Sequence, residues 1–185
     1  LVQDCDAVVS CLGHSVSLRG VFGPPRDLVT QAAKRLCQAI RETRPLAPAR
    51  FVLMSSVSVN HPAKPERRRG AVQKAVLWVL RALVPPAKDN QQAADFLVHD
   101  VGVDDHYVQW VAVRPDSLRE GETSDYSLHE TIVSSLFRPD DTNMANVAHF
   151  MCELVTDSTT WHRWKGGLPV ITNSPAGPDL LVRDA

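Results

Sequence analysis

The sequence predicts an α/β fold in which helices cover both faces of a parallel sheet, the doubly wound class. Short apolar runs that end at glycine, serine or proline indicate strands buried on both faces. The longer stretches between them place apolar residues three or four positions apart, as one face of a helix does. The resulting order of strand, helix, strand, helices and strand is typical of right-handed crossovers on a parallel sheet.

The first part of the chain supplies two strands and one helix. Residues 6–12 (DAVVSCL) form a short apolar run ended by a glycine, and we expect a buried strand there. A proline pair at 24–25 can open the helix that follows, and an Arg-Pro pair at 44–45 stops it. The second expected strand is 51–55 (FVLMS). The apolar face of the helix consists of Leu28, Val29, Ala32, Ala33, Leu36, Cys37 and Ile40.

Two helices and a third strand follow. A very apolar helix is expected over 71–84, and after two prolines another begins at about Asp89 and runs to His99. The first of these has too few polar positions for a free surface helix, so we expect it to pack in the core. A lid over a substrate cleft and contact with a partner subunit are the alternatives. Residues 108–113 (VQWVAV) give the third strand, ended by an Arg-Pro pair, because a residue before proline avoids the helical region.

The last part of the chain adds one amphipathic helix over 144–155, which Thr142 or Asn143 can cap. Residues 169–172 are expected to add a short final strand. Two nearby tryptophans at 161 and 164 are expected to pack rather than to stack on a cofactor. Because no internal repeat or domain boundary is visible, the chain is expected to form a single domain over 1–185.

Composition and charge exclude several classes of protein. The chain is 44% hydrophobic, and its 20 basic and 21 acidic residues leave no broad positive field for nucleic acid or a membrane. The longest apolar stretch, 75–86, is interrupted by an arginine and is shorter than the ~20 residues of a bilayer span. Four irregularly spaced cysteines indicate reduced thiols and a cytoplasmic location. The close pairs Cys11 with His14 and His149 with Cys152 offer too few ligands for zinc, so no metal is expected.

Polar residues follow the last apolar residue of each of the three main strands. These segments are Gly13-His14, Ser55-Ser56 and Pro115-Asp116-Ser117. In doubly wound sheets, ligands bind beyond the carboxyl ends of the strands. We therefore expect the three segments to meet along one edge and to frame a small-molecule site. A serine hydrolase is excluded, because no GxSxG turn is present.

These strand ends, in this order, resemble the second half of an atypical short-chain dehydrogenase/reductase. The resemblance is to the NAD(P)H-binding kind that includes biliverdin/flavin reductase-like and NmrA-like proteins. The fourth strand of those folds is matched by DAVVSCLG, and the fifth, with its serine pair, by FVLMSSVSVN. The sixth strand, with its VRP turn, is matched by VQWVAVRPDSL, and the late helix that follows is matched by NVAHFMCELVTD. The likeness covers residues 4–173. It implies part of a Rossmann-like sheet, the C-terminal half of an NAD(P)-binding domain, with NADP or NAD as the cofactor.

The resemblance also implies roles for the strand ends. The loop after the first strand would lie along the ribose and pyrophosphate of the cofactor, where a glycine lets the backbone come close. Ser56 corresponds to the serine that binds a substrate carbonyl, and one alignment puts Asn90 at the family's lysine position; these two are the catalytic candidates. The turn after the third strand would border the nicotinamide. The cofactor-binding candidates are Leu12, Gly13, His14, Ser55, Pro115, Asp116, Ser117 and Leu118.

Two departures from the family pattern bear on activity. No GxxGxxG or GxGxxG segment occurs, so the phosphate-binding loop and its strand are missing from the sequence. We expect either a chain truncated at its N-terminus or a remnant that holds a dinucleotide weakly. A third alternative is that the polypeptide binds nothing by itself, because its first strand lacks the partner strand of the family fold and leaves an open edge. The tyrosine-lysine pair that donates a proton in most of the superfamily is also missing, because Val111 and Glu130 stand four residues beyond Tyr107 and Tyr126. An acceptor that needs little acid help, such as a flavin or quinone, is then expected.

Each candidate also has a simpler structural interpretation. Ser55 and Ser56 can terminate a strand, and His14 can be a solvated loop residue. Asn90 can cap the helix that it begins. The arginines at 67–69 are expected to form a solvated loop. The function expected first is an NAD(P)H-dependent oxidoreductase that acts on a small-molecule substrate, with self-association left open; the alternative is a catalytically inactive NAD(P)-binding sensor or scaffold.

Overall fold

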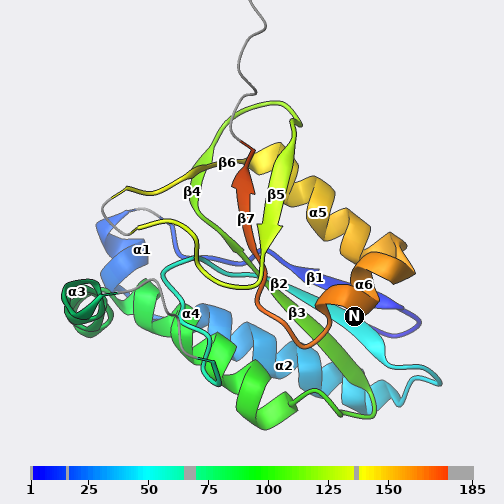
Figure 1. Ribbon diagram of the computed structural model, residues 1–185. Helices are drawn as coiled ribbons and strands as arrows, with labels where there is room; N and C mark the ends of the chain where they lie inside the picture. Colours follow the sequence, from blue (N-terminus) through cyan, green and yellow to red (C-terminus); the bar gives the residue numbers. More distant parts are fainter. Residues whose placement is uncertain (1, 16, 65–69, 136–137, 175–185) are drawn as a thin grey trace, which may run out of the picture.

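A five-stranded sheet runs through the centre of the protein, in the order β1-β2-β3-β7-β5 (Figure 1). The computed structural model describes residues 2–15, 17–64, 70–135 and 138–174. The strands are β1 (Ala7–Ser10), β2 (Ala49–Met54), β3 (Val108–Pro115), β4 (Ser117–Arg119), β5 (Tyr126–His129), β6 (Asp141–Asn143) and β7 (Val170–Asn173). The helices are α1 (Leu18–Phe22), α2 (Leu28–Thr43), α3 (Ala71–Leu83), α4 (Pro85–Phe96), the π-helical turn η1 (Leu97–Val101), α5 (Met144–Thr156) and α6 (Ser158–Trp164).

The main strands are parallel, as the sequence predicts. β1 pairs with β2, β2 with β3 and β3 with β7 in parallel, whereas β5 is antiparallel to β7. Ser10 lies opposite Leu53, and Leu53 lies opposite Ala112, so β1, β2 and β3 reach the same edge together. β1 is the outer strand of the described sheet, in agreement with the open edge expected for the first strand.

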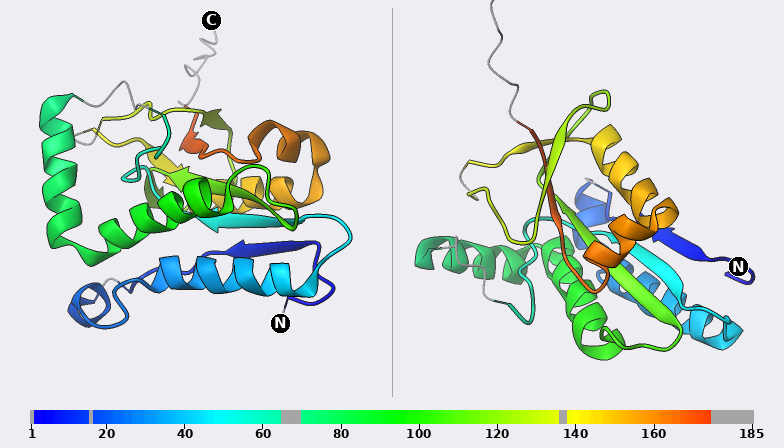
Figure 2. Two further views of the ribbon diagram at one scale, coloured as in Figure 1. Left: turned by 90° about the horizontal axis from the view of Figure 1, so that it is seen from below. Right: turned by 45° about the vertical axis from the view of Figure 1, so that its right-hand side comes forward.

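Helices cover both faces of the sheet, with α2 and α4 on one face and α5 and α6 on the other (Figures 1 and 2). Successive side chains of a strand point to opposite faces. Phe51 and Leu53 of β2 pack into the core beneath α2 and α4, whereas Val52 packs into the core beneath α5 and α6. In β3, Trp110 packs beneath α2 and α4, whereas Val111 packs beneath α5 and α6. Both faces exclude water, which explains why these strands are near-continuous apolar runs in the sequence.

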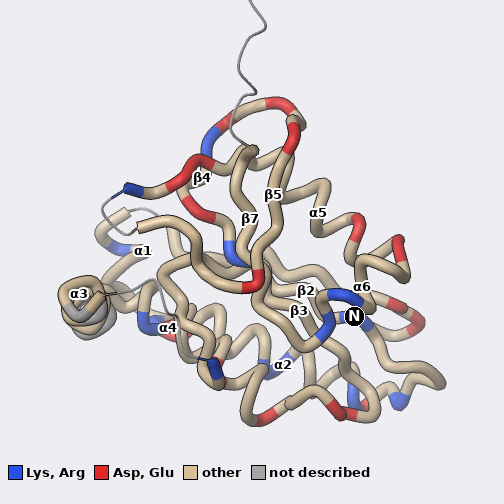
Figure 3. Tube along the Cα trace, viewed as in Figure 1, with Lys and Arg blue, Asp and Glu red and all other residues tan. Residues whose placement is uncertain are grey.

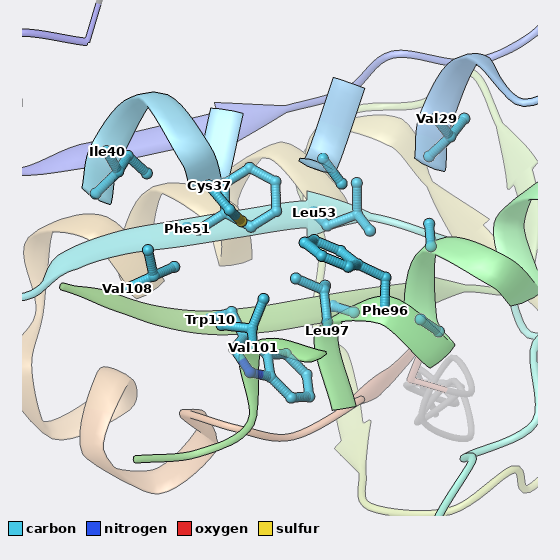
Figure 4. Close-up of a cluster of buried hydrophobic side chains, with 14 of the residues drawn as sticks. Val29, Cys37, Ile40, Phe51, Leu53, Phe96, Leu97, Val101, Val108 and Trp110 are labelled. Carbon is cyan, nitrogen blue, oxygen red and sulfur yellow. The ribbon is translucent and has the colours of Figure 1, made fainter. Parts of the chain in front are cut away.

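Figure 4 shows the core between the sheet and the helices α2 and α4. The predicted apolar face of α2 supplies Val29, Cys37 and Ile40, all of them buried. Phe51 of β2 and Trp110 of β3 belong to the same cluster. The spacing of apolar residues in the sequence therefore identifies the buried side of α2 correctly.

The start of α4 differs from the prediction. The sequence placed this start at about Asp89, but the helix begins at Pro85, with Pro85 and Pro86 in its first turn. Proline suits this position because its missing N–H is one that the first turn would leave unpaired anyway. Asn90 therefore lies inside α4, and the interpretation of Asn90 as the cap of this helix is wrong.

The segment between β3 and α5 contains three short strands that the sequence did not reveal. β4 and β6 form a separate two-stranded parallel sheet, and β5 joins β7 at the edge of the main sheet. Elements of three or four residues are too short to show a period. The short helices α1 and α6 were missed for the same reason. Trp161 and Trp164 of α6 are buried, which confirms that they pack in the core.

Helix α3 spans nearly the predicted residues, but the prediction that its apolar residues pack in the core is wrong. Val72, Trp78 and Leu83 are exposed, whereas Leu77 is buried. The predicted solvated loop at 67–69 lies outside the described residues. In the described part of the chain, no helix combines the length and the apolar character needed to cross a membrane.

Candidate functional site

The three predicted segments lie at the carboxyl edge of the sheet. Ser10, Leu53 and Ala112 are in register across β1, β2 and β3, and the three segments begin two or three residues beyond them. The parallel arrangement brings chain segments some 40 to 100 positions apart in the sequence to one edge, as expected for a doubly wound sheet. This arrangement is the geometric basis of the candidate site.

The ends of β2 and β3 are joined directly by backbone hydrogen bonds. The Ser55 N–H donates to the Val113 carbonyl at 2.7 Å, and the Val57 N–H donates to the Pro115 carbonyl at 3.1 Å. The pairing therefore continues past the last residue of β2 and fixes the loop with the two serines beside Pro115.

The two serines differ in their surroundings. Ser55 is buried, and its hydroxyl has no hydrogen-bond partner among the described residues. Ser56 is half-buried, and its Oγ accepts a hydrogen bond from the Ser58 N–H at 3.2 Å. A buried hydroxyl without a partner costs free energy, and Ser10 at the end of β1 has the same feature.

The loop after β1 is open. Leu12 and Gly13 are exposed, and within the described structure no atom lies within 4 Å of the position that a Cβ on Gly13 would take. Packing inside the protein therefore does not require a glycine here. The open space leaves the backbone of this loop accessible to a ligand.

His14 faces inward from this loop, because its side chain is only 5% exposed. Its Nε2 lies 2.8 Å from Asp89 Oδ2 of α4, and its Nδ1 lies 3.2 Å from the carbonyl oxygen of Gly20. Both partners are acceptors, so each contact requires a proton on the ring nitrogen that faces it. The ring holds the loop against α4, and the solvated-loop interpretation of His14 does not describe it.

Asp89 is the residue of this region that the sequence interpretation missed. It is fully buried, and its carboxylate accepts hydrogen bonds from the N–H of Val29 at 2.8 Å and of Thr30 at 3.0 Å. The Thr30 hydroxyl donates to the same carboxylate at 2.6 Å. Asp89 of α4 thus caps the N-terminus of α2, while the carboxylate of Asp27, the residue just before α2, accepts from Gln31 instead.

The segment after β3 does not leave the sheet as a free turn. The Asp116 carboxylate accepts hydrogen bonds from the Ser134 hydroxyl and, at 3.1 Å, from the Asp140 N–H. Ser117 and Leu118 belong to β4, where they pair with β6. Pro115 is buried at the end of β3, so these candidates lie beside one another on a strand and its continuation.

Asn90 lies on α4, next to Asp89 and half-buried. The neighbouring Gln91 connects this part of α4 to the loop after β2, because its Oε1 accepts from the Asn60 N–H at 3.0 Å. Its Nε2 donates to the Asn60 carbonyl at 3.1 Å. The helix and the loop after β2 are therefore held together through Gln91.

Arg114 is a second residue whose role the sequence did not reveal. Its side chain is fully buried, and its guanidinium donates to the carbonyls of Leu168 at 2.8 Å, Val59 at 3.1 Å and Glu130 at 3.3 Å. These carbonyls belong to three different loops. The arginine of the VRP segment thus ties the end of β3 to the loops around the candidate site.

An open cavity of about 440 Å³ lies one strand beyond β3, at the carboxyl end of β7. Its lining includes His129 of β5, Thr172 of β7 and Asp140, whose N–H holds Asp116. Small-molecule sites usually measure about 300 to 1,000 Å³, so the size suits a small organic ligand.

A further polar group lies on the other side of β5 and β7. The Tyr126 hydroxyl donates to Glu153 Oε2 at 2.7 Å and lies 2.9 Å from His149 Nδ1. Burial, together with the adjacent Glu153 carboxylate, raises the pKa of Tyr126 well above its ordinary value. Tyr126 is therefore held protonated and engaged with α5, away from the serine loop.

The residues present fit one end of a dinucleotide. The open backbone at Gly13 and the unpartnered hydroxyl of Ser55 offer contacts at the carboxyl edge, where nucleotides bind in doubly wound sheets. A glycine-rich cradle for the pyrophosphate is not among the residues of this sequence. Across the described ranges, no three His, Cys, Asp or Glu side chains gather as a metal ion would require.

Comparison with known families gives one match that covers most of the chain. The model of a family described as NAD(P)H-binding matches residues 1–158. No curated protein is similar enough in sequence to match.

Several solved structures share the fold. The oxidoreductase ylbE from Lactococcus lactis is 19% identical, with a TM-score of 0.61 over 95% of this chain and 65% of its own. A Streptococcus pneumoniae protein provisionally assigned as an NADH-flavin reductase is 14% identical, with a TM-score of 0.57 over 91% and 72%. A short-chain dehydrogenase/reductase from Veillonella parvula, in complex with NADP, is 12% identical, with a TM-score of 0.56 over 95% and 65%. At these identities the likeness shows the fold alone, and this chain spans about two thirds to three quarters of each relative.

Proposed function

This chain belongs to the NAD(P)H-binding family, and from that premise we propose that it is an NAD(P)H-dependent oxidoreductase. The reaction is hydride transfer to a small organic acceptor such as a flavin or a quinone. The observation that carries the proposal is the convergence of three strand ends at one edge, with the Ser55–Ser56 loop hydrogen-bonded to Pro115 through Val57.

The residues at this edge contact different parts of the cofactor. The exposed backbone of Leu12 and Gly13 lies along the nucleotide, and the Ser55 hydroxyl gains in the cofactor the partner that the protein does not provide. Pro115 and the segment after it border the nicotinamide. When bound, the dihydronicotinamide supplies the hydride that reduces the acceptor.

Ser56 positions the acceptor. Its hydroxyl accepts one hydrogen bond from the Ser58 N–H, so its own hydrogen remains available to a carbonyl of the substrate. Asn90, one residue before the Gln91 that contacts this loop, is the second candidate for orienting the same group.

The choice of acceptor follows from the missing tyrosine-lysine pair. Tyr126 is engaged with Glu153 and His149, and four residues beyond Tyr107 stands a valine. An acceptor that takes a hydride without concerted proton donation from the protein suits this site. The same feature favours a second candidate function, an NAD(P)H sensor that binds the nucleotide and performs no chemistry.

The test measures nucleotide binding and turnover separately. Calorimetry with NADPH and NADH gives binding, and loss of nicotinamide absorbance with FMN or a naphthoquinone gives turnover. Ser56→Ala is expected to lower kcat about 100-fold or more, because a hydrogen bond to the reacting carbonyl is lost. Ser56→Thr keeps the hydroxyl and is expected to retain most activity, and Ser58→Ala, two residues along the same loop, is the matched control.

The outcomes separate the two candidates. Turnover that depends on Ser56 but not on Ser58 supports the oxidoreductase. Binding without turnover with either acceptor supports the sensor. Equal losses in the two alanine variants would assign Ser56 to loop structure and would remove it from the proposed site.

A further inference from the structure

The loop that follows β1 has no backbone attachment of its own. Leu12 and Gly13 are exposed, and no backbone hydrogen bond joins residues 12–14 to the other described residues. The loop after β2 is different, because the N–H groups of Ser55 and Val57 bond carbonyls of β3. The position of the first loop therefore depends on a side chain that it carries.

His14 is that side chain. Its ring is 5% exposed, and its Nε2 donates to the Asp89 carboxylate at 2.8 Å. Asp89 is a fixed partner, because it is fully buried and accepts hydrogen bonds from the N–H groups of Val29 at 2.8 Å and Thr30 at 3.0 Å. His14 thus attaches the loop after β1 both to α4 and, through the Asp89 carboxylate, to the start of α2.

The second contact of His14 is weaker. Its Nδ1 lies 3.2 Å from the carbonyl oxygen of Gly20 on α1. Helix α1 has five residues, none of them buried, so it opens more readily than α4 does. The hydrogen bond to Asp89 is therefore the one expected to fix the loop.

The same part of α4 also fixes the loop after β2. Gln91, two residues beyond Asp89, accepts a hydrogen bond from the Asn60 N–H at 3.0 Å and donates one to the Asn60 carbonyl at 3.1 Å. A short stretch of α4 thus holds both loops of the candidate site. The spacing between the two loops is set by this helix.

We propose that His14 is a positioning residue that sets the affinity for NAD(P)H. Through Asp89 it holds the backbone of Leu12 and Gly13 where the nucleotide lies along it, an inference that rests on the proposed function above. A loop that is ordered before binding loses less conformational freedom when the ligand binds, so the affinity is higher. Figure 3 shows a basic residue and no acidic one on α1, the helix next to this loop, so this helix does not repel the phosphates of a nucleotide.

The ring of His14 does not itself contact the cofactor. Its burial leaves little surface for a ligand, and both of its nitrogens already face acceptors inside the protein. His14 therefore acts through the loop, whereas the hydroxyl of Ser56 contacts the acceptor in the proposed function. A positioning role in nucleotide binding changes KM for the nucleotide, and loss of a contact made only in the transition state changes kcat.

Two amide variants separate the two contacts of the ring. In His14→Gln the amide nitrogen takes the place of Nε2 and keeps the bond to Asp89. In His14→Asn it takes the place of Nδ1 and keeps only the bond to Gly20. Both variants lose the ring, so each is a matched control for the other. His162→Asn, at an exposed histidine of α6, controls for the same substitution away from the site.

The measurements are nucleotide affinity, turnover and loop order. His14→Asn is expected to weaken NADPH binding in calorimetry about tenfold and to raise KM for NADPH equally, with kcat for FMN reduction within about twofold. His14→Gln and His162→Asn are expected to stay within about threefold of the unmodified protein. In ¹⁵N relaxation, the order parameters of the Leu12 and Gly13 amides are expected near about 0.85 in the unmodified protein and in His14→Gln, and below about 0.6 in His14→Asn.

The outcomes distinguish this inference from the proposed function. Equal losses of affinity in His14→Asn and His14→Gln would overturn the inference, because the bond to Asp89 would then not position the loop. Loss of order at Leu12 and Gly13 without loss of affinity would also overturn it, since the nucleotide would not lie along this loop. An unmodified protein that binds neither NADPH nor NADH would refute the proposed function and the role of His14 in affinity. The order parameters would then decide by themselves whether His14 holds the loop.

Discussion

Replacing Asp89 with alanine is expected to destabilise the protein by about 3–5 kcal/mol. The Asp89 carboxylate is the acceptor for two backbone N–H groups in the first turn of α2 and for the Thr30 hydroxyl, and it contacts His14. Val29 is 1% and Thr30 is 8% exposed, so water cannot readily replace the lost acceptor. The perturbation therefore removes a helix cap and leaves buried donors without partners.

The magnitude follows from these parts. Loss of a side-chain cap costs about 1 kcal/mol, and each of the two backbone N–H groups left unpaired costs about 1–2 kcal/mol, the lower part of the usual range for a buried donor. The sum, about 3–5 kcal/mol, is a large share of a typical folding free energy of about 5–15 kcal/mol. With a urea m-value of about 2 kcal/mol/M, the unfolding midpoint falls by about 2 M.

The assay is urea unfolding of Asp89→Ala beside the control Asp95→Ala. Asp95 lies on the same helix and accepts one hydrogen bond, from Gln91 at 2.9 Å, in a partly exposed position. Its loss is expected to cost less than about 1 kcal/mol. Hydrogen exchange adds a local readout, because the amides of Val29 and Thr30 should exchange faster in Asp89→Ala. A midpoint for Asp89→Ala equal to that of the control would refute the capping role.

Three further predictions concern stability and reactivity. Arg114→Met removes the buried donor to three loop carbonyls and is expected to cost about 2–4 kcal/mol in urea unfolding. Burial alone would raise the pKa of Asp105, but hydrogen bonds from Arg41 and from two backbone N–H groups lower it below its usual value. Its stabilising contribution is therefore full at neutral pH and is lost as pH falls from about 4 downward, so the stability gap between the unmodified protein and Asp105→Asn should close in acid. Burial raises the pKa of Cys37 to about 12, so alkylation of the folded protein should label the three exposed cysteines and spare Cys37 until unfolding.

Each of these has a result that would contradict it. Arg114→Met as stable as the unmodified protein would show that the loop carbonyls find other donors. If the difference in free energy of unfolding between the unmodified protein and Asp105→Asn stays constant down to about pH 2, the ion pair is not its cause. Labelling of Cys37 at the rate of the exposed thiols would show that the core around α2 opens under native conditions.

The sequence predicted the elements whose apolar pattern is long or continuous. The face of α2, the buried runs of β2 and β3, and α5 were all identified, because burial on a fixed side imposes a period that can be read directly. The start of α4 was misplaced, because Pro85 and Pro86 were interpreted as a break although proline also suits a first helical turn. The short strands β4, β5 and β6 carried no readable period.

The sequence predicted the location of the candidate site but not the contacts that its side chains make. Parallel strands bring their carboxyl ends to one edge, so Gly13, Ser56 and Pro115 could be placed together before any coordinates. The roles of Asp89 and Arg114 could not be predicted from the sequence, because both side chains bond partners that are far away in the sequence. The side chains of His14 and Asp116 also proved to be engaged inside the protein.

The amino-acid sequence by itself determined the α/β class, the parallel order of the main strands and the edge at which polar segments gather, because local periodicity and strand ends encode them. Only the tertiary structure decided which apolar helix is buried and which is exposed. A period shows that a helix has an apolar side, but the partner that covers this side comes from other parts of the chain. For α2 the partner is the sheet, whereas Val72, Trp78 and Leu83 of α3 are exposed, so the same kind of pattern makes a core in one case and a surface in the other.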